Sequence, residues 1–165
     1  MRQMRRFPQE LTPEECRRVL ERGTHGVLAV LGDEGYPYAV PLSYVYEDGK
    51  IWFHCAKQGH KLDAIRKEPK VSFCVVDQDQ VVPEEYTTYF RSVIAFGTAR
   101  ELEDEGEKRT ALEVLAAKYS PDQVEGRQKE IQSAFDRVTM VELAVEHMTG
   151  KQAQELVQKK NSSTL

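Results

Sequence analysis

Cysteine, tryptophan and long apolar runs are scarce in this chain of 165 residues. The three cysteines, Cys16, Cys55 and Cys74, form no CxxC pair, which disfavours a disulfide framework or a zinc knuckle and indicates reduced thiols in the cytoplasm. No apolar run approaches the roughly 18 residues that a membrane-spanning helix needs. The basic start, residues 1–6, has no apolar segment behind it, so we expect no secretory signal and no membrane partner, although its arginines would also suit an anionic surface.

The chain also lacks a basic excess and the common catalytic motifs. Its 23 Lys and Arg against 27 Asp and Glu give a net charge of −4, which argues against a nucleic-acid partner. There is no Walker loop, no GxGxxG after a strand and no GxSxG elbow, and no set of His and Cys has metal-ligand spacing, so we expect no metal site. The length and the 40% of hydrophobic residues predict a single domain that spans residues 1–165.

Hydrophobic runs separated by turn residues predict six β-strands. They are expected at Gly26–Leu31, Tyr38–Tyr46, Ile51–His54, Lys70–Val76, Thr87–Arg100 and Val138–His147. Pro41 removes a ladder hydrogen bond and therefore places its strand at an edge or a bulge, and Gly97 indicates a second bulge. We interpret the polar, proline-containing segment Asp77–Tyr86 as a loop.

Helix signals occur between and beside these strands. The capping sequence at Thr12 starts a helix that stops at Gly23, so residues 1–22 form an N-terminal helical segment. Further helices are expected at Leu62–Lys67, Asp104–Tyr119 and, briefly, Ile131–Phe135, and the tail of residues 152–165 could begin as another. Strands joined by turns rather than by regular helices predict a mainly β protein, an antiparallel barrel with flanking helices.

The loop after the third predicted strand carries the clearest candidate for a binding site. Lys57, Gly59, His60 and Lys61 lie together at the start of the helix Leu62–Lys67. Glycine lets the backbone approach a ligand, two basic side chains follow it, and the helix dipole favours an anion at this end. The pattern predicts a phosphate site; the alternative is a solvated first helical turn in which these side chains hold no ligand.

Three segments taken together resemble a known family. They are YPYAVPLSYVYEDGKIWFHCAKQGHKLDAIRKEPKVSF, YFRSVIAFGTAR and EHMTGK, in this order within residues 23–151. They are similar to the FMN-binding split-barrel proteins related to pyridoxamine 5′-phosphate oxidase, and most of all to the nitroimidazole-resistance (Nim-like) branch. The resemblance implies a six-stranded antiparallel split β-barrel that forms a homodimer with FMN bound at the subunit interface.

The resemblance also implies a set of cofactor-binding residues. They are Pro41, Leu42, Ser43, His54, Cys55, His60, Lys61 and Ser92. The first three would lie beside the isoalloxazine ring, mainly through their backbone, and the next two would line the flavin. His60 and Lys61 would hold the phosphate, and Ser92 would lie near the polar edge of the ring.

His54 is the catalytic candidate, because the Nim-like branch has a histidine linked to substrate or electron-donor chemistry at this position. From the residues alone, a strand histidine is also typical of a satisfied core side chain, and Ser43 and Ser92 are also typical strand serines.

The resemblance implies an FMN-dependent oxidoreductase with a small-molecule electron donor and a small-molecule acceptor, for which nitro-aromatic compounds are candidates. Pyridoxamine-phosphate oxidase activity itself is not expected, because residues 152–165 lack the arginine and tryptophan of that branch's substrate-binding segment. One alternative is a flavin- or haem-binding protein without turnover, with His54, His60 or His147 as the axial ligand. Another is a catalytically silent dimer that serves as an interaction platform.

Overall fold

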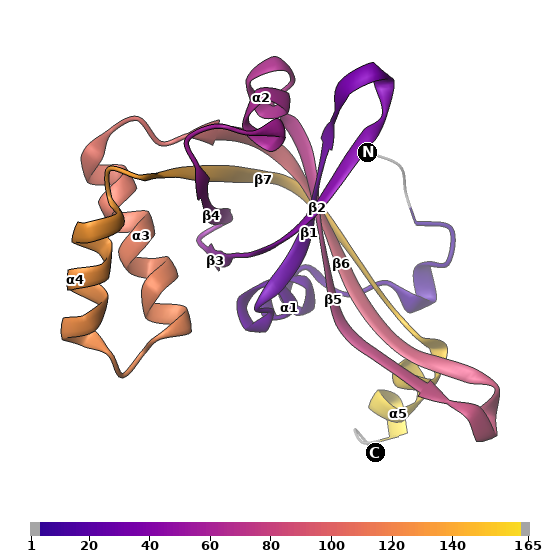
Figure 1. The fold of residues 1–165 in the computed structure, drawn as a ribbon. Coiled ribbons are helices and arrows are strands. Elements are labelled where there is room, and N and C mark those ends of the chain that lie inside the picture. Colours follow the sequence, from indigo (N-terminus) through magenta and orange to yellow (C-terminus); the bar gives the residue numbers. More distant parts are fainter. Residues whose placement is uncertain (1–3, 163–165) are drawn as a thin grey trace.

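The computed structural model describes residues 4–162, with side chains for residues 4–158, so the outermost parts of the predicted N-terminal segment and C-terminal tail lie outside the described residues. One antiparallel sheet of seven strands forms the body of the molecule (Figure 1). The strands are β1 His25–Leu31, β2 Pro37–Ser43, β3 Val45–Glu47, β4 Lys50–Ala56, β5 Lys70–Val82, β6 Thr87–Glu101 and β7 Val138–Gln152. Their order in the sheet is β2-β1-β5-β6-β7-β4-β3.

The strand pattern predicted from the sequence is confirmed with one difference in count. The predicted strand Tyr38–Tyr46 is divided at Tyr44 into β2 and β3, which lie at the two ends of the strand order. Pro41 is therefore on an edge strand, where its missing N–H breaks no ladder between inner strands. The ladder between β6 and β7 shifts register between Phe96 and Gly97, which confirms the bulge there.

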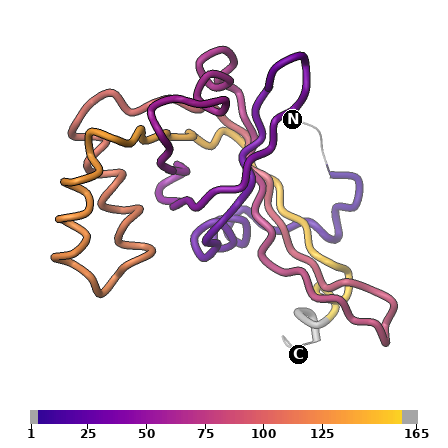
Figure 2. The backbone as a smooth tube through the Cα atoms, in the orientation of Figure 1, coloured from indigo at the N-terminus to yellow at the C-terminus, as the bar shows by residue number. Residues whose placement is uncertain are grey.

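The prediction of a loop over Asp77–Tyr86 is wrong. The strand β5 continues to Val82, and only the short 3-10 turn Pro83–Glu85 separates it from β6. A register shift between Val76 and Gln78 interrupts the alternation, and the polar residues beyond it lie on an exposed hairpin, so their composition resembles that of a loop. The hairpin forms a long arm that extends away from the body beside α5, Gln154–Ser162 (Figures 1 and 2).

The helices flank the sheet. The helix α1, Pro13–Arg22, begins with the expected capping box, in which Thr12 and Glu15 satisfy each other's backbone N–H. The helix α2, His60–Lys67, follows β4. The helix α3, Glu105–Tyr119, is antiparallel to α4, Val124–Ala134, which is longer than the short helix predicted at Ile131–Phe135 (Figure 1). None of the helices of residues 4–162 is long and apolar enough to cross a membrane.

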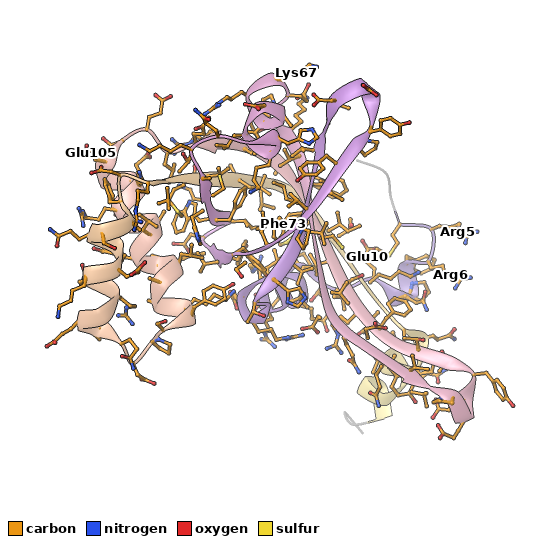
Figure 3. All side chains as sticks on the ribbon, in the orientation of Figure 1. Arg5, Arg6, Glu10, Lys67, Phe73 and Glu105 are labelled. Atoms are coloured by element: carbon orange, nitrogen blue, oxygen red, sulfur yellow. The ribbon has the colours of Figure 1, made fainter. Side chains whose placement is uncertain are left out.

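Two hydrophobic clusters hold these elements together. The larger cluster fills the interior of the barrel, where Tyr44, Phe53 and Phe73 are fully buried. Figure 3 shows Phe73 at the centre, where the strands cross. The smaller cluster joins Leu112 and Leu115 of α3 to Met140 of β7 on the outer face of the sheet. The α3–α4 hairpin is therefore anchored to the outside of the barrel, with α3 against β3, β4 and β7.

Candidate functional site

A pocket of about 580 Å³ lies between the α3–α4 hairpin and the outer face of the sheet. It is lined by Ser43, His54, Leu112, Leu115, Ala116, Tyr119, Ser120, Glu130, Ile131, Ala134, Arg137 and Val138. Its volume falls within the range of small-molecule and cofactor sites, and its mainly apolar wall with a few polar groups has their usual character.

Two of the sequence-predicted residues meet on the sheet side of this pocket. Ser43 is the last residue of β2, and His54 lies on β4 opposite Met140 of β7. Because side chains alternate along a strand, Phe53 and Cys55 point into the barrel core while His54 points toward the helices. The structure therefore brings Ser43 and His54 together, and His54 is an exposed pocket residue rather than a core histidine.

The helical wall is attached to the sheet by the end of α3. The backbone N–H of Tyr44 donates to the hydroxyl oxygen of Tyr119 at 3.0 Å, and this hydroxyl also lies within hydrogen-bonding distance of the carbonyls of Tyr44 (2.8 Å) and Thr24. The ammonium group of Lys118 donates to the carbonyl of Gly23 and lies 4.4 Å from the centre of the Tyr44 ring. These contacts set the distance between Tyr119 and Ser43 at one side of the pocket.

A buried carboxylate supports the other end of α3. Glu142 of β7 accepts from the indole N–H of Trp52 at 3.0 Å and from Nε of Arg100 at 3.0 Å, and Nζ of Lys50 lies 3.1 Å away. Burial raises the pKa of Glu142, but these hydrogen bonds outweigh it and leave the pKa below the ordinary value of a glutamate. Arg100 also donates to both carboxylate oxygens of Glu107 in the first turn of α3, at 3.0 Å each.

The predicted phosphate site is present as an open helix start. Gly59 precedes α2 with a φ of +139°, no side chain caps the helix, and a Cβ at Gly59 would meet nothing within 4 Å. The backbone N–H groups of His60 and Lys61 therefore have no partner within the helix, whereas that of Leu62 donates to the carbonyl of Gly59 at 2.9 Å. Lys61 is half-buried beside them, and no hydrogen bond or ion pair engages its ammonium group within the described part of the chain.

His60 also contacts the β1–β2 hairpin. Its ring stacks on Tyr38, with centroids 4.2 Å apart and planes inclined by 17°, and its Nε2 lies 3.6 Å from Oδ2 of Asp33. His60 thus joins α2 to the β1–β2 hairpin, and the ammonium group of Lys61 has no partner among the described residues.

The remaining predicted residues are distributed over both faces of the sheet. Pro41 lies on the outer face, whereas Leu42 packs against the barrel core. Cys55 is buried in that core; burial raises the pKa of its thiol, the charge of Glu101 acts in the same direction, and nearby Lys61 only partly offsets them. The thiol is therefore protonated at neutral pH and unsuited to act as a nucleophile.

Ser92 lies far from His54 within one chain. On β7, His54 is opposite Met140 and Ser92 is opposite Lys151, so the two positions are 151 − 140 = 11 residues apart. At about 3.3 Å per residue this corresponds to roughly 36 Å along the strand. A single chain does not bring Ser92 to the pocket.

The sequence analysis missed the helical half of the pocket. Tyr119, Glu130 and Arg137 line it, but they belong to no motif. The available signal was the apolar face of α3. It indicated that this helix packs against another element, but it did not indicate that a pocket lies beside the helix. Among the described residues no group of three or more His, Cys, Asp or Glu side chains is placed to hold a metal ion.

The residues present fit a phosphorylated aromatic cofactor. The open start of α2 with Lys61 offers donors to a phosphate, and the approach to it is not blocked by a side chain at Gly59. The apolar pocket wall suits a ring system, and Ser43 and His54 supply polar atoms at its edge.

Solved structures of other proteins share this fold. A candidate 5-nitroimidazole antibiotic resistance protein of Bacteroides thetaiotaomicron is 22% identical, with a TM-score of 0.73 over 86% of this chain and 85% of that chain. A conserved hypothetical protein of Mycobacterium tuberculosis is 19% identical, with a TM-score of 0.80 over 93% and 92%. The FAD and heme binding protein of Mycobacterium smegmatis is 18% identical, with a TM-score of 0.74 over 88% and 74%.

These identities are low, so the likenesses concern the fold, and they confirm the predicted split barrel with flanking helices. A search of curated protein sequences found no match. The model of the pyridoxamine 5′-phosphate oxidase family, however, matches residues 12–152, which include all seven strands of the sheet, and the chain therefore belongs to this family.

Proposed function

We propose that the protein binds FMN between two copies of the chain and acts as an oxidoreductase that passes electrons from a small-molecule donor to a nitro-aromatic acceptor. The observation that carries the proposal is the pocket between Ser43 and His54 on the sheet and the α3–α4 hairpin, in a chain of a family named for an oxidase. Bound FMN would supply the electron-transfer chemistry.

Lys61 and the first amides of α2 would hold the phosphate, because an ammonium group and unpaired N–H groups at a helix start favour an anion. Ser43 and the edge-strand backbone around Pro41 would orient the ring, since an edge strand presents backbone groups with no partner strand. Leu112, Leu115 and Ile131 would exclude water from one side of the site.

His54 would hold or move a proton at one of its imidazole nitrogens. It is exposed to the pocket, and neutral imidazole carries both a donor and an acceptor nitrogen. Reduction of an aromatic nitro group to a nitroso group consumes two electrons and two protons and releases water, so the site needs such a proton donor.

A two-copy assembly is supported by the place of Ser92 and by the outer face of the sheet. Ser92 lies roughly 36 Å along the strand from the His54 position, a distance that a second copy can bridge if the outer faces pack together. That face carries exposed Leu31, Val76 and Ile94, apolar side chains of the kind that homodimer interfaces bury. In such an assembly Ser92 of one copy would reach the pocket of the other.

The proposal is tested with holoprotein under anaerobic conditions. We expect the blue absorbance of the bound flavin to disappear on addition of a reduced nicotinamide and to return on addition of a nitro-aromatic compound. Bound flavin whose absorbance does not change on either addition would support the alternative of a binding protein without turnover. A mass of one chain for the flavin-loaded species would contradict the two-copy site.

A further inference from the structure

The pocket between α3–α4 and the sheet has charged groups at two separate places on its helical wall. Glu130 lies within α4, and Arg137 lies after its end, directly before β7. Glu130 is four residues before the end of α4 at Ala134, about 6 Å along the helix axis. The helical wall of the pocket therefore carries one carboxylate, Glu130, and one guanidinium group, Arg137, seven residues apart in the sequence, together with apolar side chains.

Arg137 is held in position but keeps free donors. Its backbone N–H donates to the carbonyl of Ala134 at 2.8 Å, and its Nε donates to the carbonyl of Ser133 at 3.2 Å. Its two terminal nitrogens contact no acceptor within residues 4–158. A guanidinium group anchored through Nε presents its remaining N–H groups as a planar fork, which matches a carboxylate.

Two neighbouring cations, Lys118 of α3 and Arg127 of α4, are engaged elsewhere. Lys118 donates to the carbonyl of Gly23, and Arg127 donates to the carbonyls of Ser120 and Pro121. Of the described residues that line the pocket, Arg137 is the one permanent cation.

The rest of the pocket lining suits a planar ring. Small Ala116 and Ala134 line the helical side together with the larger Leu115 and Ile131. Ser43 and His54 line the pocket from the sheet. Glu130 would repel an anionic substituent and Arg137 would attract it, so the two charges favour one orientation of a bound ring.

We infer that the electron acceptor of this pocket is an aromatic carboxylate, with its carboxylate on Arg137 and its reducible group turned toward Ser43 and His54. The inference rests on the proposed function for the place of the flavin, and it adds the substrate class and the residue that selects it. Arg137 is a specificity residue in this account and takes no part in the electron transfer.

The test uses two probes of the same shape, 4-nitrobenzoate and its neutral analogue 4-nitrobenzamide. Trp52 is the only tryptophan of the chain and lies two residues before His54 on the same face of β4, so quenching of its fluorescence reports binding without turnover. For the holoprotein we expect 4-nitrobenzoate to bind about tenfold more tightly than 4-nitrobenzamide, as for a charge-assisted hydrogen bond at a partly exposed site.

Arg137→Gln should remove this preference and leave the affinity for 4-nitrobenzamide unchanged, and Arg137→Lys should restore part of it. Lys129→Gln is the control, because Lys129 is an exposed cation on α4 outside the pocket lining. Equal affinities for the two probes, or an unchanged preference in Arg137→Gln, would overturn the inference. A loss of flavin from Arg137→Gln would also overturn the inference, because it would mean that the guanidinium group binds the cofactor rather than the acceptor.

A failure of the proposed function can be distinguished from a failure of the Arg137 inference. If the protein takes up no flavin, the oxidoreductase proposal fails, whereas the two probes still report whether Arg137 selects a carboxylate in the flavin-free protein. The folded state of each variant is checked by its thermal unfolding, and Arg137→Lys keeps the test valid if the glutamine variant is unstable.

Discussion

Tyr119→Phe is expected to destabilise the fold and to loosen the helical wall of the pocket. The substitution removes one oxygen atom, the acceptor for the backbone N–H of Tyr44, and with it the contacts to the carbonyls of Tyr44 and Thr24. Tyr44 is fully buried, so its N–H loses its partner in a place that water reaches poorly.

A buried donor without a partner costs about 1–3 kcal/mol. Tyr119 itself is 40% exposed, and water can replace part of the lost interaction, so we expect a loss of about 1–2 kcal/mol in the free energy of unfolding. Urea unfolding of the unmodified protein and of Tyr119→Phe measures this difference in the free energy of unfolding. Tyr36→Phe is the matched control, because Tyr36 is 72% exposed and its hydroxyl contacts no group in the described structure; it should change stability by less than about 0.5 kcal/mol.

A loss from Tyr119→Phe no larger than that of the control would refute the reasoning, since it would mean that the end of α3 is not held by this hydroxyl. If Tyr119→Phe lowers the free energy of unfolding by the expected amount and ligand binding does not change, the hydroxyl of Tyr119 stabilises the fold without contributing to binding in the pocket.

Two further outcomes follow from the charged groups around the site. Glu142→Gln should destabilise the protein by about 1.5–3 kcal/mol near neutral pH, the range for hydrogen bonds to a charged group. Because the folded state lowers the pKa of Glu142 below its ordinary 4.5, this stabilisation is complete above that pH and is lost as the pH falls through the lowered pKa, so unfolding curves of the two proteins should converge in acid. Lys61→Ala should weaken FMN binding about tenfold or more in a fluorescence titration, as expected for a lost charge-assisted contact to phosphate. Lys67→Ala, at the exposed far end of the same helix (Figure 3), should leave the affinity unchanged, and equal effects of the two variants would contradict the phosphate site.

The elements that depend on local chemistry could be predicted from the sequence. Thr12 and Glu15 indicated the capping box of α1, and Pro41 indicated an edge strand because proline has no N–H for a ladder. Gly97 indicated the bulge of β6, where a Cβ would lie 1.9 Å from the carbonyl oxygen of Ala144. Each of these signals involves residues whose backbone requirements are visible without the fold.

The features that depend on distant contacts could not be predicted in this way. The arm of β5 beyond Val76 is polar because it is exposed, and its strand character comes from pairing with β6. The stacking of the His60 ring on Tyr38 could not be predicted either, because only the β1–β2 hairpin brings Tyr38 beside it. Arg137 reaches the pocket because α4 turns into β7 at that point, and no motif contains it.

The identity of the chromophore tests the central claim most directly. The absorption spectrum of freshly purified protein is recorded, and the bound compound is then released by heat and identified. The account predicts flavin bands in the blue and near-ultraviolet and released FMN. A Soret band would assign the pocket to haem, and a colourless protein that takes up no added FMN would contradict the proposed function.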